Sequence, residues 1–359
     1  MEITRPTLLI DEIIVKKNIR NMVAKAERSG TELTPHFKTH QSRAVGLWFR
    51  DQGIKSITVS SVSMAQYFAD DGWQKITIAF PLNILEIKEI ATLASKIELT
   101  VLVTNKEQIM ALQTYAEVYV KVLIEIDCGS HRSGLDRHDQ LIADLILMLQ
   151  HSQHQFQGFY SHFGHTYAAK SASEVGEIYH KSLKILTDLQ LKYAYAKPTI
   201  SLGDTPSCSI IDDFSRIVSL HAGNFVFYDL MQVQIGACDE SCIGVVLACP
   251  VVSKDHERLE AIIYGGGVHL SKESMFDTDL SVSIYSKIVH LAENGWTKSI
   301  RGCYVKSISQ EHGVVKLSAK AFNDLKIGDI IGVLPVHSCM TADVMGGYVD
   351  INGNIIDHM

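Results

Sequence analysis

A lysine between two histidines is the first group in this sequence with side chains suited to catalysis. Residues 34–40 read Thr-Pro-His-Phe-Lys-Thr-His, so His36 and His40 flank Lys38. Pro35 fixes its own backbone and disfavours a helix at the residue before it, which places the lysine at the end of an extended segment. Burial or positive neighbours lower the pKa of such an amine, which can then act as a Schiff-base nucleophile or general base. An ordinary solvated lysine is the alternative interpretation.

A glycine-flanked arginine is the second candidate. Residues 127–134 read Asp-Cys-Gly-Ser-His-Arg-Ser-Gly, with Arg132 between the glycines. Glycines allow a tight turn of the backbone, and the guanidinium group is a planar fork of donors that suits a phenolate or carboxylate oxygen. The alternative is a structural loop in which Arg132 forms an ion pair with Asp127 or Asp136.

Two imidazoles and two phenols occur within residues 160–167, as Tyr160, His162, His165 and Tyr167. An imidazole beside an aromatic cofactor can stack on it or relay protons. Buried histidines with satisfied hydrogen bonds are the other interpretation of this loop. The roles of His36, His40 and His165 stay open.

Small residues and hydroxyls follow two later strands and predict an anion site. Gly203 and Thr205 precede a predicted helix, and Gly223 and Asn224 follow the last strand of the series. Free N–H groups and the dipole at a helix N-terminus favour a phosphate, and no P-loop lysine or dinucleotide fingerprint accompanies the site. A reactive amine facing a phosphate site is what pyridoxal 5'-phosphate requires. The residues therefore predict this cofactor on Lys38.

His337 and Cys339 form a candidate metal pair near the C-terminus. In an extended segment, residues two apart face the same side, so both could bind one ion. Nitrogen plus thiolate suits zinc, whereas a carboxylate would suit manganese or magnesium. Two ligands are half a site, so two unrelated strand residues are the alternative. Cys238 and Cys242 predict no metal site, because no second pair lies at zinc-ribbon spacing.

The elements that must position these residues are short β-rich runs that alternate with amphipathic helices. We expect eight strands, at residues 32–37, 56–61, 75–80, 98–103, 118–126, 156–161, 199–203 and 216–220. This alternation predicts an α/β fold with a (β/α)8 TIM-type barrel over residues 15–235, whose chemistry gathers at the C-terminal ends of the strands. Residues 1–14 and 236–359 are predicted to form a mostly antiparallel β domain that carries His337 and Cys339.

Composition excludes several classes of partner. The chain has 359 residues, 46% hydrophobic, with a formal net charge of -7. No basic cluster is present to attract nucleic acid or anionic lipid, and no apolar run is long enough to span a membrane. The N-terminal sequence lacks the features of a signal peptide, and seven scattered cysteines are typical of reduced thiols. We therefore expect a cytoplasmic protein.

Taken together, these motifs resemble the D-serine dehydratase and D-threonine aldolase group, pyridoxal-phosphate enzymes of the alanine-racemase-like fold, or fold type III. Residues 227–229 (Phe-Tyr-Asp) and 310–313 (Gln-Glu-His-Gly) add to the resemblance. It implies a homodimer in which Lys38 carries the cofactor and His337 and Cys339 bind Zn2+, Mn2+ or another divalent ion. It also implies that the cofactor phosphate is held by Gly203, Thr205, Gly223 and Asn224. The ring or the substrate would contact Arg132, Tyr160, His162 and Tyr167.

The resemblance further implies dehydration of D-serine, or a related D-3-hydroxy amino acid, to a 2-oxo acid and ammonia. In that reaction Lys38 would take the α-proton, while the metal lets the β-hydroxyl leave. Cys339 favours the dehydratase branch, because the aldolase branch more often has a carboxylate at this position. Three alternatives are a D-threonine aldolase, an amino-acid racemase on the same fold, and a non-catalytic carrier of pyridoxal phosphate.

Overall fold

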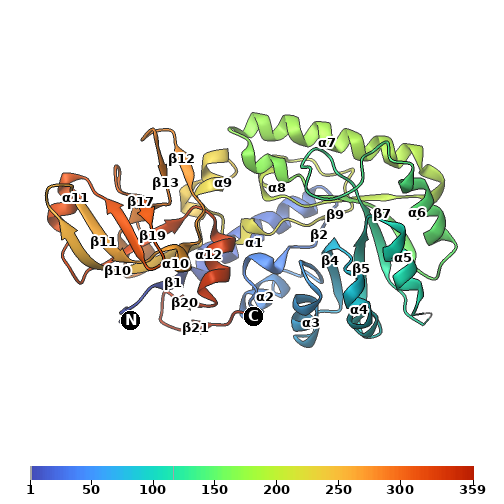
Figure 1. Ribbon diagram of the computed structural model, residues 1–359, viewed down its shortest axis with the longest axis horizontal. Coiled ribbons are helices and arrows are strands. Elements are labelled where there is room, and N and C mark those ends of the chain that lie inside the picture. The colour runs from blue at the N-terminus through green and yellow to red at the C-terminus, as the bar shows by residue number, and fades with distance from the viewer. Residues whose placement is uncertain (1, 116) are drawn as a thin grey trace. The chain divides into compact units, whose positions relative to one another are not determined.

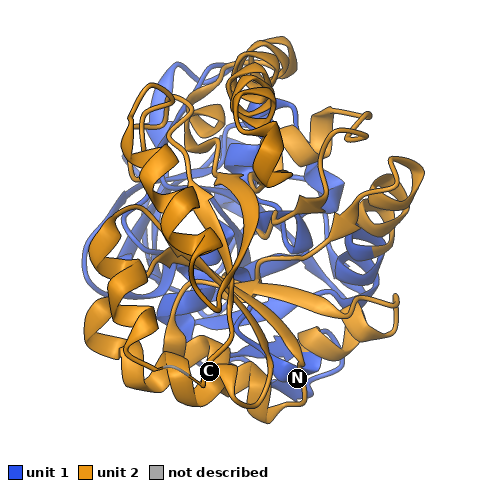
Figure 2. Ribbon diagram, turned by 90° about the vertical axis from the view of Figure 1, so that its right-hand side faces the viewer, with its two compact units in different colours: residues 1–19, 39–44, 224–359 blue, residues 20–38, 45–223 orange. Residues whose placement is uncertain are grey.

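The computed structural model describes residues 2–115 and 117–359, which divide into two compact units (Figure 2). The first unit comprises residues 1–19, 39–44 and 224–359, and the second comprises 20–38 and 45–223. Residues 1 and 116, which the predicted domain ranges include, lie outside the described residues. The chain leaves the second unit directly after Lys38 and again directly after Gly223.

The second unit is built on eight parallel strands, as predicted, in the order β2-β9-β8-β7-β6-β5-β4-β3. The strands are β2 (Glu32–Leu33), β3 (Ser56–Val59), β4 (Lys75–Pro81), β5 (Glu98–Val103), β6 (Lys121–Glu125), β7 (Gln155–Ser161), β8 (Thr199–Leu202) and β9 (Ser219–Leu220). Helices alternate with them and flank the sheet (Figure 1). The α-helices with most of their residues here are α2 (Arg43–Arg50), α3 (Val62–Asp70), α4 (Ile87–Ala94), α5 (Lys106–Gln113), α6 (Leu141–Gln150), α7 (Ala172–Lys192) and α8 (Thr205–Ile210), while α1 (Glu12–Arg28) has residues in both units. The TIM-type barrel is thereby confirmed.

The barrel closes just before Lys38. The first strand was predicted to reach residue 37, but its regular ladder with β9 covers only Glu32 and Leu33. Pro35 has no N–H to donate on the opposite side, where its carbonyl accepts the N–H of Thr58. An isolated parallel bridge between His36 and Thr58 joins the two ends of the sheet. The N–H of His36 donates to the carbonyl of Ala222 at 2.9 Å, and the N–H of Thr58 donates to that of Pro35 at 2.9 Å. The backbone of His36 is therefore held between its two neighbouring strands.

Phe37 anchors the short 3-10 helix η1 (Phe37–Thr39) that carries the lysine. Its side chain is fully buried, and its ring centroid lies 5.1 Å from Phe49, 4.9 Å from Phe68 and 5.2 Å from Trp73. Aromatic pairs of this kind contribute about 0.5–1.5 kcal/mol each beyond the burial of their area. This cluster holds the turn in place.

The amino-terminal half of the barrel interior is polar, which the sequence analysis did not predict. It encloses a cavity of about 180 Å³ whose lining includes many hydroxyl side chains. The hydroxyl-bearing lining residues are Thr34, Ser56, Thr77, Thr100, Thr199, Ser201 and Ser219. TIM barrels usually fill this space with branched apolar side chains. The lower part of this barrel is therefore not the packed apolar core that the fold usually has.

The first unit contains a nine-stranded, mostly antiparallel sheet in the order β11-β18-β17-β14-β19-β10-β1-β20-β21. As predicted, the N-terminal segment adds a strand, β1, which pairs antiparallel with β10 and parallel with β20. The sheet strands are β1 (Thr7–Ile10), β10 (Val245–Asp255), β11 (Glu260–Tyr264), β14 (Ser286–Val289), β17 (Tyr304–Ile308), β18 (His312–Lys316), β19 (Ile330–Pro335), β20 (Tyr348–Asp350) and β21 (Ile355–Ile356).

Two hairpins and four α-helices complete this unit. They are β12 (Met275–Asp277) with β13 (Val282–Ile284), β15 (Leu291–Ala292) with β16 (Gly295–Trp296), α9 (Leu230–Ile235), α10 (Gly267–Leu270), α11 (Ala319–Asp324) and α12 (Ser338–Met345). Leu9, Val246, Val289 and Leu334 belong to one buried apolar cluster of the unit. Among the described residues, no helix combines the length and hydropathy needed to cross a membrane.

Gly158 in β7 gives a test of the barrel register. Its φ is +149°, and a Cβ there would lie 2.1 Å from the carbonyl oxygen of Thr199 on β8. We expect Gly158→Ala to lower the free energy of unfolding by more than about 2 kcal/mol, as measured by urea denaturation. Gly176→Ala is the matched control, because a Cβ at this position of α7 meets nothing within 4 Å. It should be neutral or stabilising by up to about 1 kcal/mol; equal effects of the two variants would contradict the register.

Candidate active site

Lys38 lines a cavity of about 280 Å³ at the carboxyl ends of the barrel strands. Four residues predicted from the sequence meet in its wall: Lys38, Arg132, Tyr160 and His162. The other lining residues, which were not assigned a site role from the sequence, are His36, Ser60, Ala79, Phe80, Pro81 and Ser133. The position of the cavity agrees with the rule that barrel chemistry lies after the strands.

His36 contacts the backbone of the lysine turn. Its Nδ1 accepts the N–H of Lys38 at 3.3 Å. Burial lowers the pKa of His36 well below its usual value, and the positive charge of Lys38 lowers it further. The imidazole beside the lysine is therefore neutral at physiological pH.

The loop that presents Arg132 is closed by hydrogen bonds to two carboxylates. Asp127 accepts the N–H groups of Gly129 at 2.8 Å and His131 at 3.0 Å, and its ion-pair partner is the His131 imidazole at 2.9 Å. The Ser133 hydroxyl donates to the buried Glu125 carboxylate at 2.7 Å. The ion pair expected in the alternative interpretation, between Asp127 and Arg132, is taken by His131 instead, and Arg132 lines the cavity.

Glycine is required at the end of this loop. Gly134 has a φ of +101°, and a Cβ there would lie 2.6 Å from the backbone nitrogen of Asp127. Burial raises the pKa of Glu125, while its hydrogen bond from Ser133 and the charge of Arg132 lower it. The loop is thus fixed at both ends, and of the two carboxylates that fix it only Glu125 had not been named from the sequence.

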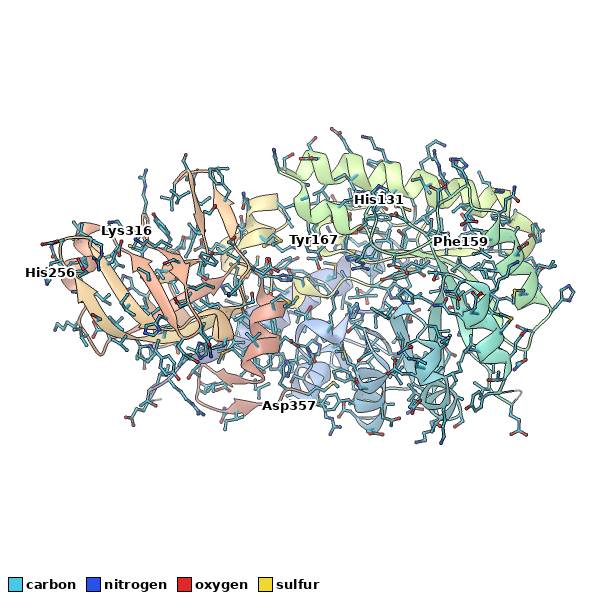
Figure 3. All side chains as sticks on the ribbon, in the orientation of Figure 1. His131, Phe159, Tyr167, His256, Lys316 and Asp357 are labelled. Atoms are coloured by element: carbon cyan, nitrogen blue, oxygen red, sulfur yellow. The ribbon has the colours of Figure 1, made fainter. Side chains whose placement is uncertain are left out.

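His162 and Tyr167 connect the cavity to the start of α8. Nδ1–H of His162 donates to the carbonyl oxygen of Gly203, so its Nε2 carries no proton. Burial, with Lys38 and Arg132 nearby, lowers the pKa of His162 well below its usual value. Tyr167, labelled in Figure 3, accepts the N–H of Thr205 on its hydroxyl at 3.3 Å and is not among the residues that line the cavity. The structure therefore places Tyr167 at the predicted phosphate site.

At the start of α8, Gly203 leaves no space for a side chain and Ser207 carries a buried hydroxyl. A Cβ on Gly203 would lie 2.8 Å from the Cβ of His221. Asp204 caps the helix, accepting the N–H of Ser207 at 2.8 Å and the hydroxyl of Thr166 at 2.9 Å, and burial raises its pKa to about 6. The buried Ser207 hydroxyl lies beside the Asp204 carboxylate, whose pKa it lowers, and it makes no other hydrogen bond among the residues that the structure describes.

His221 is a buried residue that sequence reasoning missed. Its Nδ1 lies 2.6 Å from the hydroxyl of Thr58, which itself donates to the carbonyl of Thr34 at 2.8 Å. The imidazole must therefore donate from Nδ1, and its buried Nε2 has no partner in the described part of the chain. Burial lowers its pKa to about 3. The sequence signal that could have found His221 is its position two residues before Gly223, because residues two apart in an extended segment face the same side.

The predicted metal pair lies in the first unit. His337 and Cys339 are hydrogen-bonded to each other, but not from an extended segment as expected: His337 is the N-cap of α12 and Cys339 lies in its first turn. Burial by itself lowers the pKa of His337, yet the hydrogen bond and charge of Cys339 outweigh it and raise the pKa to about 9. Burial would raise the pKa of Cys339, but His337 lowers it. Contact between the two side chains therefore shifts both pKa values in the direction that favours the charged forms.

Further hydrogen bonds hold the thiolate. The Sγ of Cys339 lies 3.2 Å from the hydroxyl of Thr39 and 3.4 Å from Nδ2 of Asn224. The buried carboxylate of Asp229 accepts Nδ2–H of Asn224 at 2.7 Å and the N–H of Ser338 at 3.0 Å. The side chain of Asn224, which was predicted to hold a phosphate, is thus directed to Cys339 and Asp229.

The residues present fit both expected groups. For pyridoxal phosphate, the cavity supplies an amine on Lys38, and the start of α8 supplies the Ser207 hydroxyl beside a glycine that leaves no room for a side chain. For zinc, His337 and Cys339 supply the nitrogen and sulfur donors that this ion prefers. Within the described residues, no cluster of three or more His, Cys, Asp or Glu side chains could hold a metal, so this pair would be half of a coordination sphere.

Comparison with known families agrees with the fold and with both units. Residues 10–217, more than half of the chain, match the family described as alanine racemase, N-terminal domain. The chain belongs to this family. Residues 244–351 match a second family, described as putative serine dehydratase domain. The combination is that of the group that the sequence motifs resemble.

Relatives of the chain align with it over nearly their whole length. A D-serine dehydratase from Dictyostelium discoideum is 28% identical, covering 97% of this chain and 93% of the relative. A D-threonine aldolase from Arthrobacter sp is 26% identical, covering 98% and 90%. A solved alanine racemase-like protein from Idiomarina loihiensis has a TM-score of 0.89 at 26% identity, covering 99% and 97%. The dehydratase and the aldolase are both lyases, and this chain is an enzyme of that kind.

Buried neutral histidines predict an acid-sensitive fold. The pKa of His40 is lowered to about 3, mainly by burial, and its Nδ1 accepts the N–H of Ser42 at 3.1 Å. Because the unfolded chain binds this proton near pH 6.5, the free energy of unfolding should fall as the pH drops from about 6.5 toward 3. His40→Asn keeps an acceptor that does not titrate, so urea titrations should show a shallower fall, by up to about 1.4 kcal/mol per pH unit. The exposed His290→Asn is the control; an unchanged slope in His40→Asn would contradict the assignment.

Proposed function

We propose that this protein is a pyridoxal-phosphate- and zinc-dependent D-serine dehydratase (D-serine ammonia-lyase). It would convert D-serine, or a related D-3-hydroxy amino acid, to a 2-oxo acid and ammonia. The observation that carries the proposal is the hydrogen bond between the side chains of His337 and Cys339, which brings a nitrogen and a sulfur donor together at the start of α12. A metal held there accounts for loss of a β-hydroxyl, for which a racemase has no need. The D-serine dehydratase relative supports the same substrate class.

The cofactor would be held at both ends. Lys38 would bond to its aldehyde carbon, and Gly203, Thr205, Gly223 and the backbone of Asn224 would hold its phosphate, with Ser207 as an added donor. Arg132, Tyr160, His162 and Tyr167 would contact the ring or the substrate. When bound, pyridoxal phosphate supplies an electron sink for charge that develops at the substrate α-carbon.

The side chains of the cavity would move the protons. Freed by the substrate amine, the Nζ of Lys38 would take the α-proton. The neutral imidazoles of His36 and His162 add no positive charge beside it. Arg132, on a loop fixed by Asp127 and Glu125, would bind an oxygen of the cofactor or of the substrate carboxylate.

The metal would act at the leaving group. His337 and Cys339 would hold zinc, which when bound supplies Lewis-acid polarisation of the β-hydroxyl. Thr39 and Asn224 would orient the thiolate through their contacts with its sulfur. A thiolate selects zinc over the harder manganese ion, although Mn2+ or another divalent ion could load with lower affinity.

A D-threonine aldolase is the second candidate, and the aldolase relative favours it. In aldol cleavage a base would remove the hydroxyl proton and the Cα–Cβ bond would break, giving glycine and an aldehyde. Cys339 argues for the dehydratase, because the resembling aldolases more often have a carboxylate there. A racemase needs no metal pair, and a non-catalytic carrier needs no β domain.

We also propose a cytoplasmic homodimer whose domains are the barrel, residues 15–235, and the β domain, residues 1–14 with 236–359. Light scattering of the purified protein and limited proteolysis at residues 14–15 and 235–236 would test the assembly and the boundaries. A monomer at micromolar concentration would contradict the first expectation.

Lys38→Ala should abolish turnover of D-serine. Loss of both the cofactor-binding amine and the base predicts a fall in kcat/KM of more than about a thousandfold, which a coupled pyruvate assay measures. Lys75→Ala removes an exposed lysine at the opposite end of the barrel and should retain activity. Comparable activity of Lys38→Ala and wild type would refute the proposed function.

Removal of the metal and a change of substrate should separate the candidates. Chelation should abolish formation of pyruvate from D-serine and of 2-oxobutyrate from D-threonine, and added Zn2+ should restore both. Cys339→Ser should weaken zinc binding by at least about tenfold, because a neutral hydroxyl replaces a thiolate. Glycine as the main product would establish the aldolase instead. Loss of the optical rotation of the amino acid at a rate that chelation does not change would support a racemase.

A further inference from the structure

We propose that His36 is a positioning residue: its imidazole caps the turn that carries Lys38 and does not transfer protons. The proposal concerns the ring of the histidine that the sequence analysis left without a role. It rests on the proposed role of Lys38 for its effect on activity, but its structural part stands on the contacts of His36 alone.

The same geometry occurs twice in the lysine motif. Nδ1 of His36 accepts the N–H of Lys38 at 3.3 Å, and Nδ1 of His40 accepts the N–H of Ser42 at 3.1 Å. In both cases the acceptor ring serves the N–H two residues later, as an asparagine or aspartate does in an Asx turn. Both histidines are buried, with 7% and 0% of their surface exposed. The repetition indicates a shared structural device on the two sides of Lys38.

The turn needs an acceptor at this point. The first N–H groups of a helix have no partner within it, and η1 (Phe37–Thr39) begins directly after His36. The backbone of His36 is already fixed by its bridge to Thr58 and its hydrogen bond to Ala222. A ring attached to this fixed point can therefore hold the lysine backbone in one position.

Charge around the ring keeps it in the form that the cap requires. Lys38 and Arg132 carry positive charge near His36, and burial with the charge of Lys38 keeps its proton off. An Nδ1 that accepts a hydrogen bond carries no proton, so a protonated ring at this nitrogen would lose the cap. An acid–base catalyst needs a pKa near the working pH. Burial and the neighbouring positive charge move the pKa of His36 well below that range.

Two variants of nearly equal size separate the two roles. In His36→Asn the side-chain oxygen can accept the Lys38 N–H as an Asx cap, whereas His36→Leu offers no acceptor. Hydrogen exchange of the Lys38 amide, followed in protein labelled with 15N-lysine, reads the cap without cofactor or substrate. We expect exchange in His36→Leu to be faster than wild type by about tenfold, in line with the loss of one hydrogen bond, and His36→Asn to stay within about threefold. His36→Ala replaces His36→Leu if the latter does not fold.

Two further measurements extend the test to the proposed function. The dissociation constant for pyridoxal phosphate should rise by about tenfold in His36→Leu and by less than about threefold in His36→Asn. The pH profile of kcat should have the same shape in His36→Asn as in wild type.

The proposal is overturned if His36→Asn loses as much amide protection as His36→Leu, or if neither loses any. It is also overturned if His36→Asn loses one limb of the pH profile while the amide stays protected, since that result assigns His36 to proton transfer. Wild-type protein that neither binds pyridoxal phosphate nor turns over a D-amino acid would refute the proposed function but leave the amide-exchange result to decide the cap.

Discussion

Closure of the barrel at His36 is the constraint on which the rest of the lysine site depends. A sheet of parallel strands closes only if its first and last strands meet, and here a single bridge between His36 and Thr58 joins them. The N–H of His36 donates to Ala222 on the other side, so one residue is held by both neighbours. Phe37 then packs into an aromatic cluster. The backbone therefore leaves the barrel at a fixed point, His36, and Lys38 follows two residues later.

Around this lysine, burial sets the charge of the site. Burial keeps His36, His162 and His221 neutral, so the imidazoles serve as hydrogen-bond acceptors and donors of defined direction. In the first unit the balance differs, because the mutual attraction of His337 and Cys339 outweighs burial and favours the charged pair. Burial thus favours the neutral form of histidine near Lys38, whereas contact with Cys339 favours the charged form of His337.

The sequence predicted most of the barrel, because each strand and helix is a local pattern. It overestimated the length of the first strand, whose regular ladder with β9 ends at Leu33, and it made no prediction for the barrel interior, which is polar. Lys38, Arg132, Tyr160 and His162 were predicted to share a site since they follow strands, and they line one cavity. Asp229 was quoted without a role and His221 was missed, because their partners, Ser338 and Thr58, lie more than a hundred residues away along the chain. Such contacts have no local signal.

Reduction with borohydride followed by peptide mapping tests the central claim most directly. If Lys38 binds the aldehyde carbon of pyridoxal phosphate, reduction should fix the cofactor as a stable secondary amine. Mass spectrometry should then find the added phosphopyridoxyl group on the peptide that contains Lys38, in near-stoichiometric amount. An adduct on another lysine, or none on protein that has been saturated with the cofactor, would contradict the assignment of Lys38 and the site built around it.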